Sequence, residues 1–142
     1  MAAGPSDPPM RLILEEAFNR GEFAAFDDRL APDSVSHIMA WGLPNNRLGL
    51  RQLIESFRLA FPDLRCTVED EISSGDGMAA RWTMRGTHTG LFFGNQPTGR
   101  TISVAGILFA HTDAGRIVED WILVDQYGVL QQLGLVPPPR GP

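Results

Sequence analysis

The chain of 142 residues has a single cysteine, no cluster of basic residues and no long apolar run. Because Cys66 is alone, no disulfide can form within the chain, and a reducing, cytoplasmic location is expected. No apolar stretch approaches the roughly 20 residues that cross a bilayer, so no membrane partner is expected. A net charge of −5 without a basic cluster also argues against binding to nucleic-acid phosphates.

The composition is that of one globular domain, with 43% hydrophobic and 20% charged residues. We expect a flexible leader over residues 1–9, a single domain over 10–136 and a flexible tail over 137–142. The leader lacks the basic start and apolar core of a signal peptide.

Apolar spacing changes from a helical period to an alternating one near the middle of the chain. Helices are expected over 10–20, 22–30 and 49–60, and a short strand or extended arm over 33–41. Strands are expected over 64–73, 78–88, 101–111 and 115–124. Asp125 and Gly134 are typical N-cap and C-cap residues of a last short helix. Three helices followed by an antiparallel meander predict an α+β fold.

The last two predicted strands are apolar on both faces. Ile107, Phe109, Trp121 and Leu123 share one face, and the opposite face carries residues such as Leu108 and Ile122. Helices can cover only one of these faces, so we expect a homodimer that forms through the other face of the sheet.

Four segments, taken in order, resemble the SnoaL-like polyketide cyclases of the nuclear transport factor 2-like superfamily. They are AFNRGEF (17–23), IESFRLAFPD (54–63), THTGLFFGNQPTGR (87–100) and DQYGVLQQLG (125–134). The resemblance implies a cone-shaped α+β barrel, in which N-terminal helices pack on a curved, mainly antiparallel sheet around a deep central pocket. Members of the family include cofactor-free enzymes that close rings on polyketides and hydroxylases that act with partner reductases.

The chain departs from the family at the residues that perform the aldol reaction. Aldol cyclases of the family carry an Asp on the last strand and a His on the strand before it. An ungapped match places Ile122 and Leu108 at these two positions. The resemblance therefore favours a cofactor-independent cyclase with a polyketide substrate and a pericyclic, Diels–Alder-type ring closure. The alternatives are acid/base ring closure, a non-catalytic small-molecule binding protein, and a hydroxylase component.

Three residues are candidates for catalysis, each with a structural alternative. Asp120 shares its face with Ile122, where an apolar wall would raise the pKa of its carboxyl, but it could instead be hydrated or paired with an Arg. His37 is expected beside Trp41 on the pocket wall, or else as a buried, satisfied histidine. His88 ends a strand at a position where the family has a His, and it could reach the pocket mouth or simply stabilise a turn.

The candidate substrate-binding residues are mainly apolar or aromatic. Asp125 is either a helix cap or a site residue, and Asp70 is either a buried acid or a residue at an open sheet end. Phe92 and Phe93 could form a lid. The histidine and cysteine spacing shows no metal motif, and no metal or other cofactor is expected. The full candidate set is Trp41, Phe57, Phe61, Asp70, Trp82, Phe92, Leu108, Ile122 and Asp125.

Overall fold

The computed structural model describes residues 8–141. Residues 1–7 of the predicted leader and residue 142 of the predicted tail lie outside the described residues. The helices are α1 (Met10–Arg20), α2 (Ala24–Arg29), α3 (Arg47–Ala60) and α4 (Gln126–Gln132). The strands are β1 (Leu30–Ile38), β2 (Arg65–Ser74), β3 (Gly77–Thr87), β4 (Thr101–Asp113) and β5 (Arg116–Val124).

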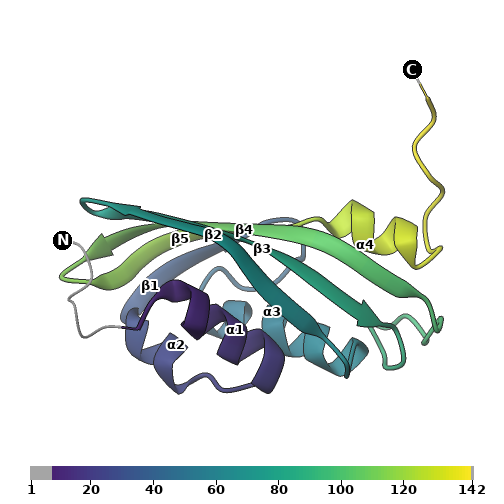
Figure 1. The fold of residues 1–142 in the computed structure, drawn as a ribbon, viewed down its shortest axis with the longest axis horizontal. Helices are drawn as coiled ribbons and strands as arrows, with labels where there is room; N and C mark the ends of the chain where they lie inside the picture. The colour runs from purple at the N-terminus through teal and green to yellow at the C-terminus, as the bar shows by residue number, and fades with distance from the viewer. Residues whose placement is uncertain (1–7, 142) are drawn as a thin grey trace.

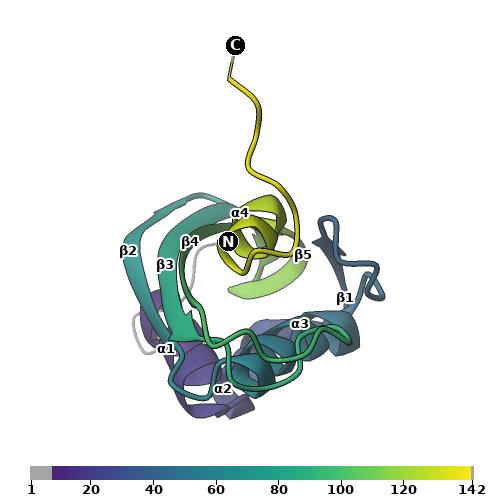
Figure 2. The same ribbon diagram turned by 90° about the vertical axis from the view of Figure 1, so that its right-hand side faces the viewer.

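A curved five-stranded sheet forms one layer, and helices α1, α2 and α3 cover the face toward which it curves (Figures 1 and 2). The strand order is β1-β5-β4-β3-β2. Strands β2 to β5 pair antiparallel, which confirms the predicted meander and the α+β fold. The sheet is not closed, because β1 and β2 are its two edges. The deep central pocket stays a prediction.

Strand β1 begins and ends three residues earlier than the arm expected over 33–41, and it pairs parallel with β5. It begins at Leu30, so helix α2 is shorter than the predicted helix over 22–30. Pro32 lies inside β1, two residues after the strand begins. An edge strand tolerates proline, because the missing N–H can face away from the ladder.

Side chains of helix α1 cover the free edge of strand β2. Asn19 accepts a hydrogen bond from the backbone N–H of Cys66 (2.6 Å) and donates one to the Cys66 carbonyl (3.0 Å). Glu15 accepts from the backbone N–H of Val68 (2.9 Å). These bonds satisfy edge groups that would otherwise be open to another strand, and they fix the helix against the sheet.

A β-bulge after Val68 reverses the expected faces of the second half of β2. Strict alternation predicts Glu69 beside Arg81, but Asp70 is the residue opposite Arg81 and accepts from its Nε (2.6 Å). The same shift turns Ile72 outward, where it is 70% exposed. Of the two alternatives for Asp70, the buried acid is wrong, since the bulge places this residue exposed on the outer face of the sheet.

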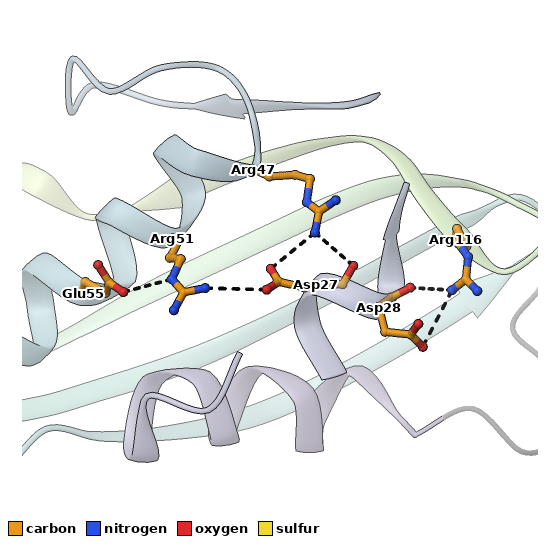
Figure 3. Close-up of polar contacts among 6 residues, drawn as sticks. All are labelled: Asp27, Asp28, Arg47, Arg51, Glu55 and Arg116. Carbon is orange, nitrogen blue, oxygen red and sulfur yellow. Dashed lines mark hydrogen bonds and ion pairs between the residues drawn. The ribbon is translucent and has the colours of Figure 1, made fainter. Parts of the chain in front are cut away.

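A group of ion pairs aligns helix α2 with α3 and with the start of β5 (Figure 3). Its members are Asp27, Asp28, Arg47, Arg51, Glu55 and Arg116. Arg51 also lies over the ring of Phe23, 4.3 Å from its centroid. All of these charged groups are partly or fully exposed, so each pair contributes little, of the order of 0–1 kcal/mol. They orient the helix more than they stabilise it.

The main core lies between the sheet and the first three helices. The outer face of the sheet keeps Ile107, Phe109 and Leu123 about half exposed, as their predicted shared face requires. A homodimer through this face stays a prediction. Among residues 8–141, no helix is long and apolar enough to cross a membrane.

Candidate functional site

Several polar side-chain atoms are buried in the described part of the chain without a hydrogen-bond partner. They are Ser34 Oγ, Trp41 Nε1, Trp82 Nε1, His88 Nε2 and Asp120 Oδ1. Buried polar atoms in folded proteins are nearly always paired, and each exception calls for an explanation. Four of the five, all except Ser34, belong to residues that the sequence analysis named as candidates, and all lie on segments that enclose the space between the sheet and the helices.

Asp120 is the only acid among them. It is fully buried on β5, between Ala110 of β4 and Ser36 of β1. The Ser36 hydroxyl donates to Asp120 Oδ2 (2.8 Å), whereas Oδ1 has no partner. One carboxyl oxygen is therefore held in place by Ser36, and the other is buried without a partner among the described residues.

Burial raises the pKa of the Asp120 carboxyl from 3.8 to about 6. The Ser36 hydrogen bond and the nearby His37 act against this rise in pKa, and Glu119 adds to it. Of these causes desolvation is the largest, because an apolar surrounding disfavours the charged form. A carboxyl that titrates near neutral pH suits a general base that must also return its proton.

Leu108 and Ile122 lie directly opposite each other on β4 and β5 and are both fully buried. Ile122 is the next inward residue after Asp120 on β5, so the two share one wall. The two positions that the sequence match aligns with the family's aldol pair therefore carry aliphatic side chains on the inner face, and the nearest titratable group on that face of β5 is Asp120.

His37 does not lie beside Asp120 on this wall. The alternation of β1 turns Ser36 and Ile38 inward and His37 outward. There His37 Nε2 lies 2.8 Å from Glu119 Oε2, and the ring stacks on Trp121 at a centroid distance of 5.0 Å. The expected position on an inner wall beside Trp41 is therefore wrong, because His37 lies on the outer face of β1, against Glu119 and Trp121.

His88 is fully buried, and its hydrogen bonds define its tautomer. Its Nδ1 accepts from the backbone N–H of Thr98 (3.2 Å) and lies 3.0 Å from the Thr98 hydroxyl. Since a backbone N–H can only donate, Nδ1 must offer its lone pair, and the proton of the neutral ring is on Nε2. His88 is therefore arranged as a hydrogen-bond donor through Nε2 and not as a base.

The rings of Phe61 and Phe92 lie beside this histidine, with centroids 5.5 and 6.3 Å away. Phe92 also contacts Trp41 (5.8 Å) and Phe57 (5.2 Å). Trp41 in turn stacks on Phe93 (5.3 Å), which is 44% exposed and has a positive φ of 45°. The aromatic candidates thus form one cluster that joins the loops over 39–46 and 88–100, and the lid role of Phe93 stays a prediction.

Trp82 lies on the inner face of β3, opposite Gly106. A Cβ at Gly106 would lie 2.4 Å from the indole, so the ring needs a glycine on the next strand. Phe18 of α1 contacts the other side at a centroid distance of 5.8 Å. Trp82 therefore closes the interior against helix α1 and presents a second buried indole N–H.

Asp125 lies outside the interior. It is exposed, and its Oδ1 accepts from the backbone N–H of Gly128 (2.9 Å) at the start of α4. Gly134, with φ of 75°, follows the helix end. Asp125 is confirmed as the N-cap of α4 at the end of β5, whereas the C-cap is Leu133, one residue before the expected Gly134.

Sequence reasoning missed the two buried serines, Ser34 and Ser36. Their position could have been predicted from the sequence, because they alternate with Ile38 and therefore lie on the same inner face of the strand, which is otherwise apolar. Thr98 was also missed, and only the folded loop reveals its contact with His88. Among residues 8–141, no group of three or more histidine, cysteine, aspartate or glutamate side chains is arranged to hold a metal.

The fold and its buried polar groups define an α+β protein of the nuclear transport factor 2-like class. The family model described as SnoaL-like polyketide cyclase matches residues 9–133, and the chain belongs to this family. The resemblance inferred from the four sequence segments is thereby confirmed.

Solved structures of similar proteins share this fold. IdmH from Streptomyces antibioticus, described as a candidate polyketide cyclase, is 35% identical, with 87% of this chain and 94% of IdmH covered and a TM-score of 0.71. AclR from Streptomyces galilaeus, described as a candidate hydroxylase, is 29% identical (91% and 81% covered, TM-score 0.75). TsrD from Streptomyces laurentii is 26% identical (88% and 92% covered, TM-score 0.75). None of the curated proteins matches the chain.

Proposed function

We propose that this protein is a cofactor-independent cyclase that closes a ring on a polyketide intermediate, with Asp120 as its acid/base group. The observation that carries the proposal is the half-satisfied, buried carboxyl of Asp120, whose pKa is raised to about 6 in an apolar interior. Membership of the family and the likeness to IdmH support the same class of reaction.

In the proposed reaction, Asp120 Oδ1 takes a proton from a carbon next to a substrate carbonyl. The resulting enolate carbon forms a new carbon–carbon bond to a second carbonyl of the same folded chain. The alkoxide produced at that carbonyl then receives the proton back from Asp120, so no oxidant or reductant is consumed. Ser36 holds the other carboxyl oxygen throughout.

The remaining unpartnered groups have a role in the same scheme. The Nε2–H of His88 and the indole N–H groups of Trp41 and Trp82 can donate to substrate carbonyl oxygens as negative charge develops on them. The aromatic cluster would hold the chain in a folded conformer. Such confinement of two reacting groups contributes up to about 7–11 kcal/mol in well-oriented systems.

A pericyclic ring closure is the second candidate, and the buried pair Leu108 and Ile122 favours it. A Diels–Alder-type reaction moves no proton, so an aliphatic wall in place of the aldol pair would not impair it. In that case Asp120 and His88 would only polarise a conjugated carbonyl. The likeness to AclR keeps a hydroxylase component as a further alternative.

The test is an assay of the purified protein with a linear, conjugated polyketide ester and no added cofactor. We expect a cyclic product with the mass of the substrate, or of the substrate less one water, detected by mass spectrometry and NMR. Binding without any product would instead indicate a binding protein. A product heavier by one oxygen atom, formed only with a nicotinamide cofactor, oxygen and a reductase, would indicate a hydroxylase.

A further inference from the structure

Two arginines face each other on the outer side of the sheet, away from the candidate catalytic site. Arg65 of β2 and Arg85 of β3 are directly opposite in the antiparallel register, and both are exposed. Like charges directly opposite on one face destabilise a strand pair. On the same face, Arg81 is neutralised by Asp70, but no carboxylate of residues 8–141 forms an ion pair with either Arg65 or Arg85.

The two arginines line an open cleft of about 450 Å³ at the end of strands β3 and β4. Hydroxyl groups surround them in this cleft, from Thr87, Thr101 and Ser103. Its one acid, Asp63, accepts from the backbone N–H of Thr87 (2.7 Å) and from the Thr87 hydroxyl (2.8 Å). These bonds lower the pKa of Asp63 and occupy both of its oxygens, so the acid is held by Thr87.

The floor of the cleft is fixed by helix α4. Gln132 accepts from the backbone N–H of Ser103 (2.7 Å) and donates to its carbonyl (3.1 Å), where strand β5 no longer pairs with β4. The Gln132 side chain thus makes, at Ser103 of β4, the pair of backbone hydrogen bonds that a neighbouring strand would otherwise make. This side of the cleft is therefore held by hydrogen bonds to the backbone, and the two arginine side chains beside it are exposed.

We propose that this cleft binds a phosphate group through Arg65 and Arg85. A guanidinium offers paired N–H donors that match two phosphate oxygens, and two guanidinium groups would neutralise the charge of a phosphodiester or monoester. An anion between them would also remove their mutual repulsion. The hydroxyl of Thr101 can supply a further donor at the same place, whereas the Thr87 hydroxyl already donates to Asp63.

The location suggests which phosphate this is, and this step rests on the proposed function. Thr87 lines the cleft, and the next residue, His88, carries one of the unpartnered donors of the interior. The cleft therefore lies at the strand end that leads to the candidate site. When a polyketide is held as a thioester on a phosphopantetheine arm, the length of the arm separates the phosphate from the reactive chain. A phosphate in the cleft and a reactive chain in the candidate site would be separated in the same way. Free phosphate shares the same chemistry and is distinguished by the experiment.

The experiment compares S-butyryl phosphopantetheine, S-butyryl pantetheine and inorganic phosphate by titration calorimetry. The variants are Arg65→Gln, Arg85→Gln and their combination, with Arg81→Gln as a control that removes one arginine from the same strand and face. We expect the wild-type protein to bind the phosphorylated arm about tenfold more tightly than the unphosphorylated arm. The double variant should lose this preference, and Arg81→Gln should retain it.

Equal affinity for the two arms, or an unchanged preference in the double variant, would overturn the proposal. If inorganic phosphate binds as tightly as the phosphorylated arm and needs the same arginines, the phosphate site is supported and the carrier arm is excluded as its source. Binding is measured without turnover, so the result is independent of ring closure. The Asp120→Asn protein should keep the full preference, which separates failure of this site from failure of the proposed cyclase.

Discussion

Replacing Asp120 by asparagine is expected to lower turnover of a polyketide substrate by about 100-fold or more, the usual contribution of general acid/base catalysis. Asparagine has nearly the same shape and can still accept from Ser36, but it cannot take up a proton. The measurement is kcat and KM with the linear ester substrate. Because the change removes a proton acceptor and not a binding surface, the loss should appear in kcat.

The pH profile provides the internal check on this result. With Asp120 as base, kcat/KM of the wild-type enzyme should rise as pH increases through about 6 and then level off. His37→Gln is a suitable control, since His37 faces away from Asp120 and pairs with Glu119. Wild-type rates in the Asp120→Asn variant would contradict acid/base catalysis and favour the pericyclic reaction.

The same substitution is expected to stabilise the protein at neutral pH. In the unfolded chain Asp120 loses its proton near its ordinary pKa of 3.8, whereas in the folded protein it keeps the proton up to about 6. Raising the pH between these values therefore favours the unfolded state, which has released its proton. A pKa difference of about two units corresponds to about 3 kcal/mol of lost stability above pH 6.

Urea denaturation of the wild-type and Asp120→Asn proteins over pH 3 to 8 measures this effect directly. The difference in unfolding free energy between the two proteins should grow by about 3 kcal/mol from the acid to the neutral end, in favour of asparagine. Subtracting one protein from the other cancels the titration of all the other groups. A constant difference across this range would mean that the carboxyl has an ordinary pKa. A variant that is more stable but inactive is the pattern expected of a functional residue.

The arrangement of the elements could be predicted because alternating and helical patterns are local. The parity of β4 and β5 placed Leu108, Ile122 and Asp120 on the inner face, and the structure confirms that placement. The N-cap at Asp125 and the glycine just past the helix end, Gly134, are also local signals, readable from residue type and position alone.

The errors have physical causes that lie outside local patterns. The bulge after Val68 is tied to a hydrogen bond from that residue to Glu15 of helix α1, which strict alternation does not anticipate. His37 was placed beside Trp41 because both occur on one extended segment, although the strand ends at Ile38 and the loop beyond it turns back. The tautomer of His88 depends on Thr98, ten residues away on a folded loop. Alternation along the sequence predicts which face of a strand a residue occupies only where no bulge interrupts the pairing.

The central claim is that Asp120 is a buried acid that titrates near neutral pH and faces the substrate. Its most direct test is an NMR titration of the protein labelled with carbon-13 at the aspartate side-chain carboxyls, with the Asp120→Asn protein used to assign the signal. The account predicts a midpoint near pH 6 and a change in that midpoint when the linear polyketide ester binds. A midpoint near the ordinary value of 3.8, unchanged by the ester, would contradict it.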